Sequence, residues 1–114
     1  MLHIGNPRPW LIISCLVLSA CQTASGQSDK PASLDAYISC NLAAARRVAG
    51  QPGDPISLAV AARGICLRQE RQLSEELIAT KGELRAHRVL QVYREGMLEA
   101  NTAEIVKMRA RTPR

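Results

Sequence analysis

The sequence predicts an all-α fold: a small antiparallel helical hairpin stapled by a disulfide, with a third helix packed against it. The chain has 114 residues, enough for one small domain, and 46% of them are apolar, which argues against disorder throughout. Aromatic residues are only 3% and Phe is absent, so Leu, Ile, Val and many Ala must form the core. Such small side chains suit close-packed helices better than a β-sandwich.

The first helix is expected over residues 34–50, "LDAYISCNLAAARRVAG". Ser33 is suited to be its N-cap, and Asp35 in the first turn meets the positive end of the helix dipole. Gly50 is expected to end the helix in a left-handed conformation, with Pro52 as a stop.

The second helix is expected over residues 55–80, after the turn "QPGDP". Asp54 is its predicted N-cap, and Pro55 takes the first helical position, where a missing N–H costs nothing. Because the turn is short, the first two helices are expected to pack antiparallel.

Cys40 and Cys66 are placed symmetrically about Gly53 at the centre of this turn, about 15 Å along each helix. They should therefore lie at the same level, with Ala44 facing Ala62 one turn nearer the loop. In an oxidising compartment we expect a disulfide, whose loop of about 26 residues contributes roughly 3.5 kcal/mol in the chain-entropy model. Two free buried thiols are the alternative. A metal or redox role is disfavoured, because the chain has no CxxC pair.

A third helix is expected over residues 83–110. The apolar stripe of the second helix ends at Leu84, beyond which the same face becomes polar. A change of phase beside Gly82 favours a turn there, and one long helix kinked at Gly82 is the alternative. The new stripe consists of Ala86, Val89, Leu90, Tyr93, Met97, Ala100 and Met108.

The N-terminal stretch has the layout of a secretory signal. Arg8 and the initiator amine precede "LIISCLVLSA", an uncharged run of about ten residues, half of what a transmembrane helix needs. The run ends in "LSAC", residues 18–21, which resembles the lipobox of bacterial lipoproteins. The resemblance implies removal of residues 1–20 as a signal peptide and acylation of the Cys21 thiol. Residues 21–32 would then form a lipid-anchored flexible tether, and residues 33–111 the helical domain.

Two alternatives to this interpretation exist. "IISC", ending at Cys15, also fits the lipobox pattern loosely, but it leaves only about four apolar residues before it, below the 7 to 15 or so that signals need. An ordinary signal peptide with a coincidental Cys21 is the other. In the lipoprotein family an Asp after the acylated Cys commonly marks retention at the inner membrane. Position 22 is Gln, so the resemblance implies the outer membrane, facing the periplasm.

The C-terminal segment combines apolar and basic residues. Without Arg8 the mature chain has 14 Lys and Arg against 10 acids, a net charge of +4. Nucleic acid is excluded as a partner by the compartment. The segment is a candidate contact for an envelope protein or for an anionic surface such as lipid headgroups, lipopolysaccharide or cell-wall carboxylates. A solvated, fraying helix end or simple core packing is the alternative. The residues concerned are Ile105, Val106, Lys107, Met108, Arg109 and Arg111.

Catalysis has little support in the sequence. His87, the only mature histidine, lies beside Arg88 on a polar face, and the adjacent Glu75 and Glu76 diverge by about 100° on a helix. We therefore expect no catalytic residues, no metal ligands and no cofactor.

The segments "SCNLAAA", "GDP" and "AARGICLRQE" make the mature part similar to small two-cysteine helical proteins exported by alphaproteobacteria, a resemblance that implies no particular activity. We therefore expect a non-enzymatic, lipid-anchored envelope protein that presents a helical module for protein or envelope contacts. An accessory lipoprotein of a secretion or conjugation apparatus is one alternative. A small ligand-binding or enzymatic periplasmic domain is another, and it would need a pocket of about 300 Å³ or more.

Overall fold

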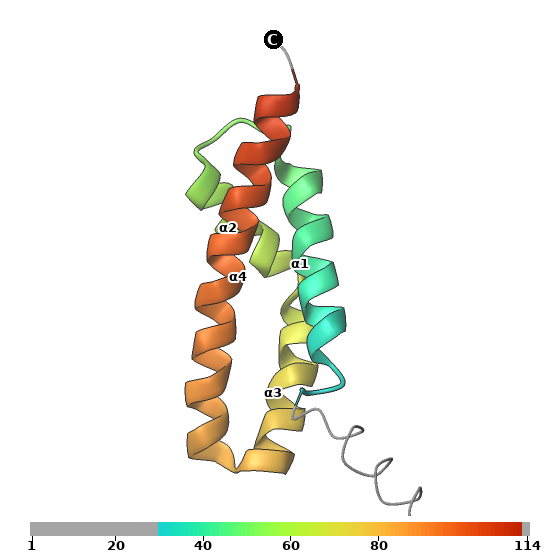
Figure 1. The fold of residues 1–114 in the computed structure, drawn as a ribbon, viewed down its shortest axis with the longest axis vertical. Coiled ribbons are helices and arrows are strands. Elements are labelled where there is room, and N and C mark those ends of the chain that lie inside the picture. The colour runs from blue at the N-terminus through green and yellow to red at the C-terminus, as the bar shows by residue number, and fades with distance from the viewer. Residues whose placement is uncertain (1–29, 113–114) are drawn as a thin grey trace, which may run out of the picture.

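The computed structural model describes residues 30–112, which form four helices (Figure 1). They are α1 (Leu34–Val48), α2 (Pro55–Ile65), α3 (Leu67–Lys81) and α4 (Glu83–Arg111). The all-α class is confirmed, and the Cys40–Cys66 disulfide is present. The expected signal peptide, Cys21 and residues 21–29 of the expected tether lie outside the described residues.

The second helix is not continuous, and the prediction of one helix over 55–80 is wrong in this respect. At Cys66 the backbone leaves the helical region (φ −103°, ψ 21°), and its N–H donates to Arg63 O, three residues back, at 3.0 Å. Cys66 is completely buried and bonded to Cys40. In Figure 1, α2 crosses obliquely behind α4, whereas α3 runs beside the lower part of α4. The break thus gives two differently directed helices where the hairpin prediction expected one long partner for α1.

The first helix begins where predicted but is capped differently. Ser33 is the N-cap residue in position, yet it makes no side-chain capping bond. Instead Glu76 of α3 accepts hydrogen bonds from Ala32 N (2.7 Å), Ser33 N (2.9 Å) and the Ser33 hydroxyl. The bonds from Ser33 are the main cause of a lowered pKa for the Glu76 carboxyl. Glu76 therefore ties the residues just before α1 to α3, and the capping bond expected of the Ser33 side chain is not formed.

The turn after α1 confirms one capping prediction and corrects another. α1 ends before Gly50, with Ala49 as its C-cap in the right-handed region, and Gly50 does not adopt a positive φ. Gly53 does, at φ 132°, so the turn uses the later glycine. Asp54 caps α2 as predicted, since its Oδ1 accepts from Ser57 N at 3.0 Å.

The turn between the last two helices is at Gly82, as predicted, with φ 80°. α4 runs to Arg111, one residue beyond the expected end. Leu84, expected to close the stripe of the second helix, is instead largely exposed beside the turn. In Figure 1, α4 extends along the whole bundle and returns the chain to the end where α1 finishes.

The core consists of two apolar clusters, one toward each end of the bundle. α1 and α4 contribute to both, whereas α2 packs only in the first cluster and α3 only in the second, so the chain changes cluster at Cys66. The first cluster contains Ala44, Ala45, Val48, Ala49, Leu58, Ala59, Ala62, Cys66 and Ile105. The second contains Leu34, Tyr37, Leu73, Leu77, Ala86, Leu90 and Met97.

Candidate functional site

A layer of buried polar side chains separates the two apolar clusters. Asn41 lies in α1 between residues of the second cluster and residues of the first, and Asn101 occupies the corresponding place in α4. Glu70 lies in α3 between Cys66 and Leu73, again where the clusters meet. All three polar residues are buried. We call Asn41, Glu70 and Asn101 the polar layer.

The two asparagines of the layer join α1 to α4. Asn101 Nδ2 donates to Asn41 Oδ1 at 3.1 Å, and Asn41 Nδ2 donates to Tyr37 O at 2.9 Å. Sliding α4 along α1 by one turn would separate these groups and leave buried amides unpaired, which costs about 1–3 kcal/mol for each group. The pair therefore opposes a shift in the register of the helices.

Glu70 holds the only buried charge of the layer, and two arginines compensate it. Arg94 Nε of α4 donates to Glu70 Oε1 at 2.6 Å. Arg63 Nε of α2 lies 3.4 Å from Glu70 Oε2, an ion pair without the geometry of a hydrogen bond. Both arginine side chains are 34% exposed, so their charges reach water while the carboxylate does not. Glu70 thus links α2, α3 and α4.

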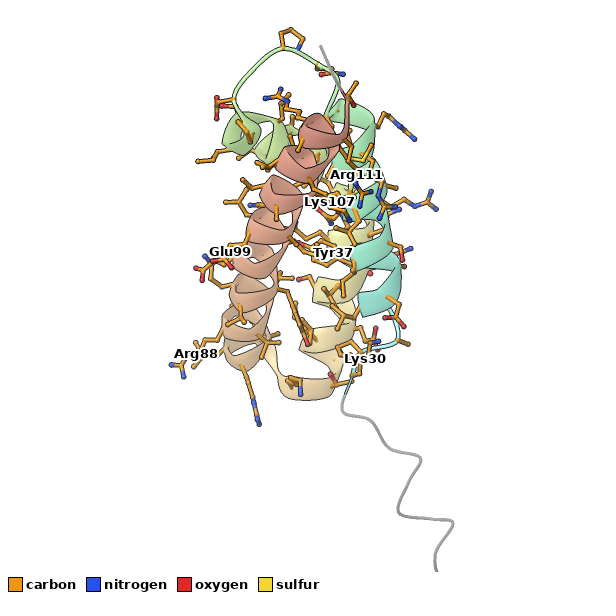
Figure 2. All side chains as sticks on the ribbon, turned by 45° about the horizontal axis from the view of Figure 1, so that its top comes forward. Lys30, Tyr37, Arg88, Glu99, Lys107 and Arg111 are labelled. Carbon is orange, nitrogen blue, oxygen red and sulfur yellow. A yellow bond between two sulfur atoms is a disulfide. The ribbon has the colours of Figure 1, made fainter. Side chains whose placement is uncertain are left out.

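Tyr37 completes this region from α1 (Figure 2). Its side chain is fully buried, and its hydroxyl has no hydrogen-bond partner among residues 30–112. Burial raises the pKa of the phenol, and the negative charge of Glu70 raises it further, against the smaller opposing effects of Arg63 and Arg94. The phenol is therefore held in its neutral form.

Two surface depressions of the described chain lie away from the polar layer. One is formed at the α3–α4 turn by Lys81–Arg85, Arg88 and Val89. The other is at the opposite end, between the α1–α2 loop and the end of α4. Within residues 30–112, no three His, Cys, Asp or Glu side chains are grouped as metal ligands. None of the described helices has the length and apolar character of a membrane span.

The apolar residues predicted as a contact at the C-terminal end are mostly covered. Ile105 is 0% exposed within the first cluster, so its prediction as an accessible residue is wrong. Met108 is partly buried against the same cluster, and only Val106 is open, at 51% exposure. The expectation depended on α4 extending beyond a short hairpin. α2 and α1 both pack against this part of α4, so little of it is left uncovered.

The basic residues of the same segment have different environments (Figure 2). Arg109 donates to three carbonyls of the α1–α2 loop: Nε to Ala49 O at 3.2 Å, and Nη2 to Gln51 O and Gly53 O, each at 2.8 Å. Arg109 therefore closes the loop onto α4 and is not a free cation. Its neighbours differ in turn: Lys107 Nζ lies 3.6 Å from Glu104 Oε2, whereas Arg111 is exposed.

The disulfide joins α1 to the junction of α2 and α3. The Cα atoms of Cys40 and Cys66 are 5.9 Å apart, within the range that a bridge requires. Cys40 directly precedes Asn41, so the covalent link and the polar layer lie at neighbouring levels of α1. Sequence reasoning found the cysteines and missed the layer. A signal was present, because Asn101 lies four residues from both Met97 and Ile105, in phase with the apolar stripe.

No family model, curated protein or solved structure matches this chain.

Proposed function

We propose that this chain is a lipid-anchored protein of the bacterial cell envelope that acts through contacts with other molecules and not by catalysis. The observation that carries the proposal is the "LSAC" sequence at residues 18–21, at the end of an uncharged run of about ten residues. Diacylglycerol on Cys21, with a further acyl chain on the new N-terminus, would supply several chains. Each buried CH₂ contributes about 0.8 kcal/mol, enough in total for stable anchoring.

The disulfide supports the compartment part of this proposal. Disulfides persist in exported proteins and are rare in a reducing cytosol. Cys40 and Cys66 form the described bridge, and Cys15 would leave with the signal peptide. Cys21 would then be the single mature cysteine left for acylation.

Metabolic labelling with an alkyne-tagged palmitate in a bacterial host tests the anchor. The wild-type chain should incorporate the label, and Cys21→Ser should lose it. Cys15→Ser is the matched control and should be labelled like the wild type, because this cysteine lies within the expected signal. Loss of label from Cys15→Ser with retention in Cys21→Ser would move the lipobox to the earlier cysteine. Labelling of neither the wild type nor the control would refute the anchor.

The choice of membrane has its own test at position 22. Gln22 follows the proposed acylated cysteine, where an Asp would favour retention at the inner membrane in the lipoprotein family. Density-gradient fractionation should place the wild type with outer-membrane markers and Gln22→Asp with inner-membrane markers. Equal distributions of the two proteins would contradict outer-membrane sorting.

The contact part of the proposal involves the end of α4. Val106 and Arg111 are exposed there, and Arg47 of α1 is exposed at the same end of the bundle. A cationic surface of this kind would favour anionic lipid headgroups or acidic polymers, with an attraction that weakens as salt is added. Arg47→Gln combined with Arg111→Gln should reduce retention on anionic vesicles but leave retention on neutral ones unchanged. Equal loss on both kinds of vesicle would point to misfolding instead.

A further inference from the structure

The outward face of α2 is apolar and carries no charge. Its exposed positions include three large apolar side chains, whereas each of the other helices exposes charged residues. The one exposed polar residue of α2, Ser57, already donates its hydroxyl to Asp54 Oδ2 at 2.6 Å. A helix that is apolar on all sides is typical of one that is covered on all sides. The exposed residues of α2 are Ile56, Ser57, Val60, Ala61, Gly64 and Ile65.

Gly64 adds an independent observation. A glycine inside a helix is less favourable than Ala by roughly 0.5–1 kcal/mol, and here the fold of the single chain does not need it. Gly64 has no positive φ, and a Cβ built on it meets nothing within 4 Å. Small residues on an outward helix face allow another helix to approach closely. The open side of Gly64, beside Val60 and Ile65, is therefore suited to receive a side chain from outside.

The charges at the two ends of α2 identify the partner. Asp54 lies at its N-terminal end, and the exposed Arg68 lies just beyond its C-terminal end, next to Arg63, which pairs with Glu70 and is still 34% exposed. We propose that α2 packs antiparallel against α2 of a second copy of this chain, with Val60 at the two-fold axis. This arrangement brings the acidic end of each helix to the basic end of the other, and it opposes the two helix dipoles.

The spacing of the apolar residues fits the same axis. Ile56 lies four residues before Val60 and Gly64 four residues after it, so Ile56 of each copy faces Gly64 of the other. A branched side chain would enter the space left by each glycine. In Figure 2, α2 lies at the edge of the bundle, so its outward face is open to a second molecule.

The size of the face determines how stable the contact can be. At 1.5 Å per residue the 11 residues of α2 span about 16 Å, so one face of this helix buries much less than the roughly 800 Å² per partner of a standard interface. The contact is therefore weak in dilute solution. Anchoring in one membrane would raise the effective concentration of the copies. The inference rests on the proposed anchor only for this last step.

Disulfide trapping of the full-length chain in intact cells tests the contact. Val60→Cys should give a band of twice the monomer mass on a gel run without reductant, and this band should disappear with dithiothreitol. Val92→Cys is the control, because Val92 is exposed on α4 away from α2. The wild type reports any dimer formed through its own cysteines. A dimer of Val60→Cys no stronger than in these two controls would overturn the proposal.

Co-production of Ile56→Cys with Gly64→Cys checks the direction of the helices. The antiparallel arrangement should trap the mixed dimer more strongly than either single variant traps itself. This pair also serves if Val60→Cys does not fold. A parallel or different contact would favour the self-dimers and would refute the register.

A matched pair of glycines separates loss of contact from loss of folding. Gly64→Leu, added to Val60→Cys, should reduce trapping by about tenfold, which corresponds to about 1.4 kcal/mol. Gly96→Leu should leave trapping unchanged, since Gly96 is also helical with open space at its Cβ but lies on α4. Leu favours helix over Gly, so neither change should lower helical content by circular dichroism. Unchanged trapping in Gly64→Leu would overturn the proposal. If Val60→Cys is trapped as a dimer but the chain takes up no palmitate label, only the proposed anchor is refuted and the α2 contact stands.

Discussion

Reduction of the Cys40–Cys66 disulfide should destabilise the domain more than any single side-chain change on its surface. The bridge joins residues 26 apart, and it holds α1 against the point where α2 gives way to α3. Without it, the middle of α1 is held against the α2–α3 junction only by non-covalent contacts. In the chain-entropy model, the bridge stabilises the domain mainly by lowering the conformational entropy of the unfolded chain.

The magnitude follows from the length of the closed loop. For a loop of 26 residues the chain-entropy model gives about 11.8 cal/mol/K, or about 3.5 kcal/mol at 25 °C. A domain of this size changes its Tm by roughly 4–8 °C per kcal/mol. Reduction should therefore lower the Tm by roughly 14–28 °C.

Urea and thermal unfolding followed by circular dichroism measure the effect. Cys66 is fully buried, so the protein should be reduced while unfolded and then returned to native conditions under reductant. A Cys40→Ala, Cys66→Ala double variant should have similar low stability and should not respond to reductant. A loss below about 1 kcal/mol on reduction would show that the reduced chain is already compact when unfolded, and the loop-entropy argument would fail.

Three further predictions concern the interior and the loop. Glu70→Gln removes the charge that Arg63 and Arg94 compensate and should lower the free energy of unfolding by about 2 kcal/mol, measured with urea. A change near zero would show that water already screens these ion pairs. Arg109→Met removes hydrogen bonds to three loop carbonyls and should lower the free energy of unfolding by about 1–2 kcal/mol. Amide hydrogen exchange in residues 49–54 should become faster. Unchanged exchange there would mean that the loop keeps its conformation without Arg109. Tyr37→Phe should be close to neutral at pH 7, because the buried hydroxyl has no partner in the described chain. The pKa of Tyr37 is raised in the folded state. The stability that the neutral phenol contributes to the fold is therefore complete below about pH 10 and is lost as the pH rises toward the folded pKa. Wild type should therefore lose up to about 1.4 kcal/mol per pH unit above pH 10 relative to Tyr37→Phe, and parallel pH curves would contradict the neutral buried phenol.

Local signals were sufficient where a structure depends on nearby residues. Asp54 and Pro55 predicted the start of α2, because capping and the fixed φ of proline act within one turn. The shift of the apolar stripe predicted the turn at Gly82 and the extent of α4. Composition alone predicted the all-α class.

The disulfide was predicted correctly, although the helix arrangement assumed for that prediction was only partly right. Its pairing followed from symmetry about the turn, although the hairpin assumed for that argument differs from the helices observed. Cys40 and Cys66 are the only two cysteines of residues 30–112, so within that part of the chain each has a single possible partner and the pairing tolerates an error in the geometry. The break at Cys66 did not follow from the sequence, since residues 55–80 contain no proline after position 55 and their apolar stripe continues through the break.

What the sequence by itself determined is the set of short-range features: helix starts, the turn at Gly82, the apolar stripes and the lipobox-like segment. Only the tertiary structure decided which polar groups are buried and which apolar ones are not. Asn41, Glu70 and Asn101 are inside because three helices bring their partners together, and Ile105 is inside because α2 covers it. Val60 stays outside because the opposite side of α2, with Leu58, Ala59 and Ala62, packs in the first cluster. Burial depends on where residues distant in sequence meet, and helical periodicity alone does not contain that information.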